Sequence, residues 1–174
     1  MQEIEKLRAI IEAQIQQIKF ERKPAELYDP ISYTLKSDGK RIRPVLTLLA
    51  CQMFSEKIED AILPALAFEV FHNFTLLHDD IMDNAPVRRG LPTVHEKWNA
   101  NTAILSGDAM MVEAYKLISK TPDFCLGKVL EIFSETALGV CEGQMLDMQF
   151  ENRDDVTESE YVEMIRLKTS VLLA

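Results

Sequence analysis

Residues 68–83 read FEVFHNFTLLHDDIMD, and this stretch decides the fold of the chain. Apolar residues recur along it and continue an apolar run that begins near Pro64. The stretch lacks the strict alternation of a strand, so we expect one long helix that ends at about Asp83. At about 100° per residue, His72, Asp79 and Asp83 fall within about 40° of one another, on one stripe of that helix.

Three carboxylates, those of Asp79, Asp80 and Asp83, end this helix, where the helix dipole already disfavours negative charge. Such a cluster destabilises a protein unless cations neutralise it. Mg²⁺ prefers hard oxygen ligands and is usually held by one or two carboxylates together with substrate phosphates. The stretch therefore predicts a magnesium site for a phosphorylated ligand. A solvated acidic helix end is the alternative interpretation.

Two basic segments flank the acidic stretch. Residues 35–44 read LKSDGKRIRP, with four cations beside a single acid, and residues 88–90 read RRG. Arginine matches phosphate oxygens in a bidentate way and lysine supplies a point charge, so both segments are candidate binders of a diphosphate. The alternative is that they only solubilise the surface.

The composition excludes several classes of protein. The chain has 174 residues and a net charge of −9, which disfavours nucleic-acid binding, and its length fits one core. Its three cysteines show no metal-ligand spacing, which favours a reducing compartment. The N-terminus lacks the apolar core of a signal peptide, and no uninterrupted apolar run approaches the ~20 residues of a membrane span. We expect a cytoplasmic protein that is not an integral membrane protein.

Helical periodicity extends over the rest of the chain. It predicts helices over residues 4–18, 24–36, 45–54, 64–83, 99–119 and 123–150, and a last helix that opens at a capping box of Thr157 and Glu160. No run with strand periodicity occurs, so we expect an all-α protein. The last helix stops inside the apolar run 171–174 without a terminating residue. We therefore expect residues 1–174 to form a single domain that is incomplete at its C-terminus.

The motifs, taken together and in order, resemble those of the trans-isoprenyl diphosphate synthases, a family of all-α head-to-tail prenyltransferases. The motifs are Gly39–Pro44, His72, Leu77–Asp83, Arg88–Gly90, Gly143–Gln144 and Lys168–Thr169. The resemblance extends over nearly the whole chain. It implies the isoprenoid synthase type I fold, a bundle of long helices around a central cavity, of which this chain is the N-terminal portion.

The resemblance also implies an activity and a set of site residues. The activity is Mg²⁺-dependent condensation of isopentenyl diphosphate with an allylic prenyl diphosphate to an all-trans polyprenyl diphosphate, by a homodimer. The metal ligands would be Asp79 and Asp83, with Asp80 in support. The substrate-binding residues would be Arg88, Lys168, Thr169 and Gln144 for the allylic diphosphate and Lys40, Arg43, His72 and Arg89 for isopentenyl diphosphate. The catalytic set would be Asp79, Asp80, Asp83, Arg88 and Lys168.

Phe74 bears on the length of the product. In the family, an aromatic residue five positions before the first aspartate shortens the product, and Phe74 occupies that position here. Five residues span about 7.5 Å of helix, comparable with one or two isoprene units, which favours a C15–C20 product. Ordinary core packing of Phe74 is the alternative.

The chain departs from the family pattern at one point, because the second DDxxD motif does not occur within its residues. We therefore expect these residues alone to be inactive. One alternative is a non-catalytic regulatory subunit of a heteromeric prenyl synthase. Another is a class I terpene cyclase, which needs no second diphosphate site, and the cations Lys40, Arg43 and Arg89 argue against it.

Overall fold

The computed structural model describes residues 2–20 and 22–173, and these residues are helical apart from loops and one short hairpin. They form two compact units, Met1–Thr121 and Pro122–Ala174, which we describe separately. The all-α class expected from the sequence is confirmed. The expectation of one domain over residues 1–174 stays a prediction.

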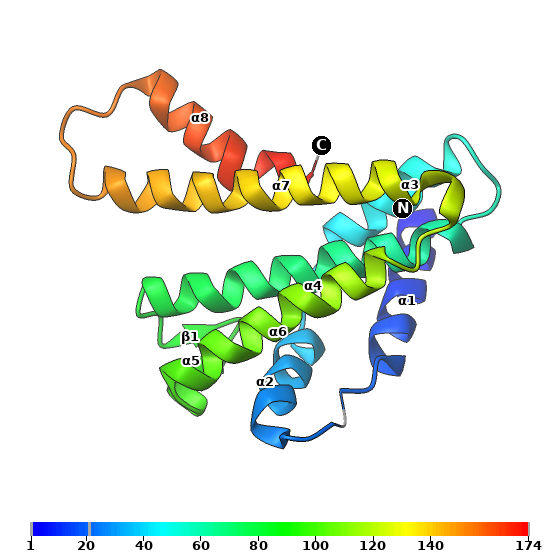
Figure 1. Ribbon diagram of the computed structural model, residues 1–174, viewed down its shortest axis with the longest axis horizontal. Helices are drawn as coiled ribbons and strands as arrows, with labels where there is room; N and C mark the ends of the chain where they lie inside the picture. The colour runs from blue at the N-terminus through cyan, green and yellow to red at the C-terminus, as the bar shows by residue number, and fades with distance from the viewer. Residues whose placement is uncertain (1, 21, 174) are drawn as a thin grey trace. The chain divides into compact units, whose positions relative to one another are not determined.

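The first unit contains six helices and a hairpin among its described residues (Figure 1). Its elements are α1 (Gln2–Gln17), α2 (Ala25–Lys36), α3 (Ile42–Gln52), α4 (Glu59–Met82), β1 (Val87–Arg88), β2 (Leu91–Pro92), α5 (Val94–Lys97) and α6 (Ala100–Ile118). The second unit contains α7 (Asp123–Phe150), α8 (Glu158–Lys168) and the 3₁₀ helix η1 (Ser170–Leu172).

Helix α4 forms the centre of the first unit. It lies beside α6 and also contacts α1, α2 and α3 (Figure 1). Its buried side chains include Leu66, Val70, Phe71 and Leu77, so it is apolar on most of its circumference. Its length and composition alone would also suit a membrane span, but half of its apolar window is buried inside the protein. This burial is typical of a core helix.

Helix α1 is held on the first unit by one apolar stripe. Leu7, Ile11 and Ile15 are between 0 and 3 % exposed and recur every four residues, so they share one face. The helix contacts α2, α3 and α4 through that face. Arg8 and Glu12 follow two of these residues directly and therefore lie next to the buried stripe.

The hairpin β1–β2 was not expected from the sequence. Val87 pairs with Pro92 and Arg88 with Leu91 in antiparallel register. The turn residues Arg89 and Gly90 have φ values of 54° and 78°, as in a type I′ turn. The prediction of no strands was wrong here because the strands are two residues long and the turn lacks the usual Asn-Gly signal.

Two helices begin earlier than expected. Helix α4 begins at Glu59 and α3 at Ile42, whereas the apolar pattern predicts starts at about 64 and 45. The first turn of α4 carries Glu59 and Asp60, which favour a helix N-terminus electrostatically but interrupt the apolar pattern. The predicted capping box of α8 is confirmed, with Thr157 and Glu160 each bonded to the other's backbone N–H.

Candidate functional site

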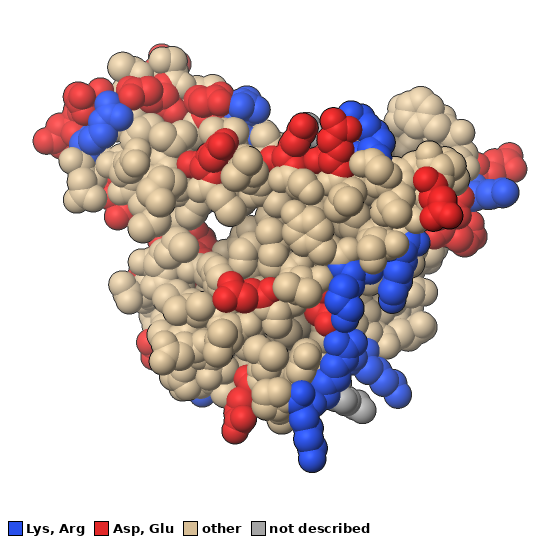
Figure 2. Space-filling model, in the orientation of Figure 1, with Lys and Arg blue, Asp and Glu red and all other residues tan. Residues whose placement is uncertain are grey.

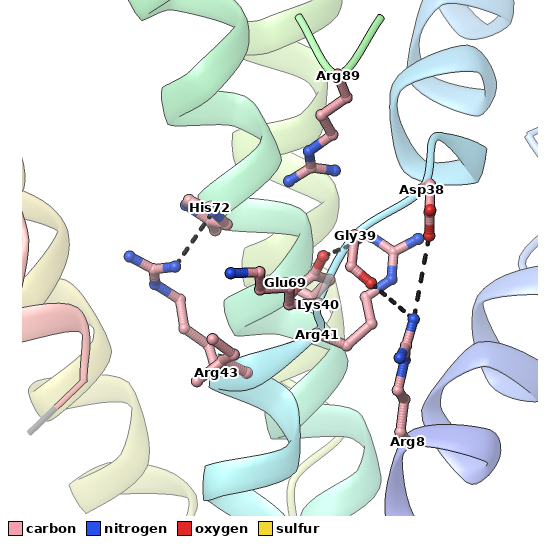
Figure 3. Close-up of a pocket in the computed structure, with 10 residues that line it drawn as sticks. Arg8, Asp38, Gly39, Lys40, Arg41, Arg43, Glu69, His72 and Arg89 are labelled. Carbon is pink, nitrogen blue, oxygen red and sulfur yellow. Dashed lines mark hydrogen bonds and ion pairs between the residues drawn. The ribbon is translucent and has the colours of Figure 1, made fainter. Parts of the chain in front are cut away.

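A pocket of about 480 Å³ lies in the first unit between α1, α3, α4 and the hairpin turn (Figure 3). Five cationic side chains and two carboxylates line it, together with a histidine. The lining residues are Arg8, Asp38, Gly39, Lys40, Arg41, Ile42, Arg43, Glu69, His72 and Arg89. On the face shown in Figure 2, lysine and arginine side chains also gather in one run, although the whole chain is acidic.

Arg41 is the structural centre of the pocket wall. It is 3 % exposed and adopts a left-handed backbone conformation, with φ of 50°, at the start of α3. Its Nε donates to Glu12 Oε1 at 2.8 Å, and Nη1 donates to Glu69 Oε1 at 2.7 Å. Nη2 donates to the carbonyls of Leu35 and Ser37. Burial opposes its charge, but the hydrogen bonds and charges of Glu12 and Glu69 outweigh burial and raise the pKa of Arg41.

Arg41 is therefore committed to holding the protein together, unlike its neighbours in the basic segment. Lys40 is exposed at the pocket, and Arg43 is half-buried. The sequence did not distinguish these roles. The signal that could have done so is Glu69, an isolated acid within the apolar part of α4, which needs a buried cation.

Arg43 and His72 lie next to each other on one side of the pocket, with Arg43 Nη1 3.2 Å from His72 Nε2 (Figure 3). Burial, together with the nearby charges of Arg43 and Arg89, lowers the pKa of His72 to about 3. The imidazole is therefore neutral at physiological pH, and its Nε2 accepts the N–H of Arg43. The Arg43 Nε atom is buried and has no hydrogen-bond partner within residues 2–20 and 22–173.

Arg89 reaches the pocket from the hairpin turn (Figure 3), and its Nη1 donates to Ser37 Oγ at 3.2 Å. Desolvation and the neighbouring charge of Arg41 lower the pKa of Arg89. Gly39 makes this crowding possible, because a Cβ atom there would lie 3.0 Å from Arg89 Nη1 and 3.1 Å from Arg41 Nη1. The structure thus brings Lys40, Arg43, His72 and Arg89 together in one pocket, and their role in binding isopentenyl diphosphate stays a prediction.

The acidic end of α4 is organised by Arg88. Arg88 Nε donates to Asp80 Oδ1 at 2.7 Å, and Arg88 Nη2 lies 3.6 Å from Asp79 Oδ2. Burial raises the pKa of Asp80, and the hydrogen bond from Arg88 offsets only part of this effect. The hairpin directs Arg88 back to α4 because Ala85 N donates to Asp80 O and Thr93 Oγ1 donates to Ala85 O.

The three aspartates therefore differ in their surroundings. Asp80 is buried against Arg88, Asp79 is half-buried and Asp83 is exposed at the C-cap. Among the described residues, no group of three or more Asp, Glu, His or Cys side chains is arranged to hold a metal ion. Asp79 and Asp83, four residues apart on one face of α4, offer hard oxygen donors that fit Mg²⁺. Their role as ligands stays a prediction.

Phe74 is half-buried and makes aromatic contacts. Its ring centroid lies 5.5 Å from that of Phe71 and 4.7 Å from that of His78. His78 in turn lies against Gly107, where a Cβ atom would come within 2.3 Å of its Nε2. These contacts suit packing and a cavity floor equally, so the role of Phe74 in product length stays a prediction.

The second unit contains the remaining predicted site residues. Lys168 Nζ donates to Asp147 Oδ2 at 2.5 Å, and Gln144 lies one turn before Asp147 on α7. Gly143 permits the close approach of α8, because a Cβ atom there would lie 2.2 Å from the Lys168 backbone nitrogen. Thr169 is exposed at the end of α8. The sequence did not predict the pairing of Lys168 with Asp147.

The model of one protein family, described as polyprenyl synthetase, matches residues 24–174. The chain belongs to the polyprenyl synthetase family. It is 42 % identical to the geranylgeranyl diphosphate synthase of Methanosarcina mazei over 99 % of this chain and 54 % of that protein. It is 43 % identical to the geranylgeranyl pyrophosphate synthase of Geoglobus acetivorans over 94 % of this chain and 52 % of that protein. The chain thus spans about half the length of these curated relatives.

The fold agrees with that of solved family members. A crystal structure of a geranylgeranyl pyrophosphate synthase superposes with a TM-score of 0.93 at 50 % identity, covering 97 % of this chain and 52 % of that one. The expected isoprenoid synthase fold is therefore confirmed for this chain. Arg8, which lines the pocket from α1, and Glu12, which accepts the hydrogen bond from Arg41, both precede the residues matched by the family model.

Proposed function

We propose that the protein is a Mg²⁺-dependent trans-prenyltransferase that condenses isopentenyl diphosphate head-to-tail with an allylic diphosphate and releases diphosphate. The pocket of about 480 Å³ with five cationic side chains, in a chain of net charge −9, is the observation that carries this proposal. Such a concentration of cations has a physical reason if the ligand carries several negative charges.

The pocket residues have distinct roles in this proposal. Lys40, Arg43 and Arg89 bind the diphosphate of isopentenyl diphosphate, because their charges are not paired with the pocket carboxylates. Neutral His72 accepts the N–H of Arg43 and so orients the guanidinium toward the ligand. Arg41 holds the wall that carries Lys40 and Arg43.

The acidic end of α4 takes the allylic diphosphate. Asp79 and Asp83 would hold Mg²⁺, whose charge would stabilise the departing diphosphate as the allylic C–O bond breaks. Arg88 binds the same diphosphate, and Asp80 fixes the orientation of Arg88 through the 2.7 Å hydrogen bond. The family resemblance also gives Lys168, Thr169 and Gln144 as binding residues for the allylic diphosphate. The double bond of isopentenyl diphosphate then attacks the allylic cation to form the new carbon–carbon bond, and the released diphosphate takes up the proton that is lost.

The direct test is an assay of the full-length protein with labelled isopentenyl diphosphate and each allylic primer, with the products sized by chromatography. The proposal expects a longer linear diphosphate that forms only with Mg²⁺. A cyclic hydrocarbon formed without use of isopentenyl diphosphate would favour a terpene cyclase instead. A protein that turns over only after a second synthase subunit is added would favour a regulatory subunit.

We propose a C15–C20 product because Phe74 lies about 7.5 Å along the helix from Asp79 and would block further growth of the chain. Several relatives are named geranylgeranyl diphosphate synthase, whose C20 product lies within this range. Others are named geranylfarnesyl diphosphate synthase, whose C25 product is one isoprene unit longer. In the same assay, Phe74→Ala should lengthen the product. An unchanged product distribution would assign Phe74 to packing alone.

We also propose that the active protein is a cytoplasmic homodimer, and that residues 1–174 alone are inactive because they lack the family's second DDxxD motif. Size-exclusion chromatography with light scattering tests the dimer. Comparison of residues 1–174 with the full-length protein in the labelled assay tests the second statement, and equal turnover would contradict it.

A further inference from the structure

We propose that Arg8 of α1 is a further binding residue for the diphosphate held in the pocket, an inference that rests on the function proposed above. Arg8 lines the pocket from the side opposite His72 and Arg43 (Figure 3). It belongs to none of the motifs quoted above, and it precedes the residues matched by the family model. Arg8 lies at the pocket because of the way α1 packs, and no sequence motif indicated this position.

The position of Arg8 is fixed by the helix that carries it. Leu7 and Ile11 are both 0 % exposed and anchor α1 on the first unit. Glu12, one turn after Arg8, receives the hydrogen bond from buried Arg41 at 2.8 Å. The same face of α1 therefore both supports the pocket wall and presents a guanidinium to the pocket.

The guanidinium of Arg8 is only weakly engaged within the protein. Its Nη2 donates to Gly39 O at 3.3 Å and lies 4.0 Å from Asp38 Oδ1. The Asp38 side chain is 97 % exposed, and such a long exposed ion pair contributes little. An arginine has five N–H donors, so most of those on Arg8 remain available to phosphate oxygens.

The charges in the pocket favour recruitment of Arg8. Arg41 is paired with Glu12 and Glu69, so Arg8, Lys40, Arg43 and Arg89 are the pocket cations that remain to face a ligand. A diphosphate carries two groups of anionic oxygens, and cations on opposite sides of the pocket can contact both groups. Arg8 approaches from α1, whereas Arg43 and Arg89 approach from α3 and the hairpin.

Isothermal titration of the full-length protein with inorganic diphosphate in Mg²⁺-free buffer tests the inference. Arg8→Gln, which keeps a donor for Gly39 O but removes the charge, should weaken binding by about 5- to 10-fold. Arg8→Lys, which keeps the charge without the fork, should weaken it by about 2- to 3-fold. Lys6→Gln is the matched control on the same helix, because Lys6 is 66 % exposed and should leave binding unchanged.

The pattern across variants separates this inference from the proposed function. If Arg43→Gln weakens binding and Arg8→Gln does not, the pocket binds diphosphate without Arg8 and the inference is wrong. If neither variant weakens binding, the proposed function of the pocket is wrong as well. Equal losses of diphosphate affinity in Arg8→Gln and Arg8→Lys would show that Arg8 only supports the backbone of Gly39, and the inference would then be wrong. Thermal unfolding checks that each variant is folded. If Arg8→Lys folds and Arg8→Gln does not, an unchanged diphosphate affinity of Arg8→Lys overturns the inference.

Discussion

Arg41→Ala should strongly destabilise the protein, because it removes a guanidinium from between two carboxylates. Arg41 and Glu69 are each 3 % exposed, and the atoms that join them lie 2.7 Å apart. Removal of one partner from a buried pair costs about 3–5 kcal/mol, since the other charge stays buried. Asn73 Nδ2 still donates to Glu69 Oε1, so we expect the lower end of this range, about 3 kcal/mol. That is a large share of the total free energy of unfolding, which is ~5–15 kcal/mol for a typical protein.

Urea unfolding followed by circular dichroism measures this loss, with the slope compared between variants to check that the transition stays the same. The double variant Arg41→Met/Glu69→Leu should lose less stability than either single variant, because no uncompensated charge remains buried. A loss below about 1 kcal/mol in Arg41→Ala, or strict additivity in the double variant, would refute the reasoning.

The pair Arg166–Glu163 on α8 supplies a matched control. It has the same chemistry and a comparable distance of 2.6 Å, but its side chains are 54 % and 49 % exposed. Solvent screens such a pair, so Arg166→Ala should leave the urea midpoint nearly unchanged. A loss as large as that of Arg41→Ala would show that burial is not the cause.

Three further variants test the site. Asp79→Ala should abolish Mg²⁺-dependent turnover of the full-length protein while leaving Mg²⁺-free diphosphate binding intact; near-normal turnover would contradict its role as a ligand. The pKa of His72 is about 3 in the folded protein and about 6.5 in the unfolded chain, so the unfolded chain binds the proton more readily. The free energy of unfolding should therefore fall as the pH falls from about 6.5 toward 3, and His72→Asn should weaken this pH dependence. An identical pH profile in the variant would count against this. Gly143→Ala should lower the unfolding temperature and raise the KM for the allylic diphosphate, because its Cβ would meet the Lys168 backbone. Gly127→Ala on the same helix meets nothing within 4 Å and should be neutral or slightly stabilising. Equal effects of the two substitutions would refute the close-approach argument.

Much of the fold was predictable because the helices follow apolar periodicity. The stripe of His72 and the aspartates on α4 was predictable for the same reason, since side chains on one helix have fixed angular relations. The hairpin at Arg89 was missed, because a two-residue strand carries no periodic signal. The pairing of Arg88 with Asp80 depends on that hairpin and was missed with it.

The different roles of the cations in the basic segment could not be predicted from the sequence either. Lys40, Arg41 and Arg43 have the same kind of side chain and lie within four residues of one another. Only the fold brings Glu12 and Glu69 to Arg41 and leaves the other two facing the pocket. Sequence pattern identifies which charges are near one another along the chain, whereas their partners come from elements far apart in it.

The packing of α1 on the first unit has a practical consequence for how the protein is produced. A polypeptide trimmed to begin at residue 24, where the family match begins, would lose both Arg8 and Glu12. Arg41 would then lack one of its two carboxylates, and the pocket would be open on one side. The boundary drawn by family similarity and the boundary required for a stable, ligand-competent molecule therefore differ by a whole helix.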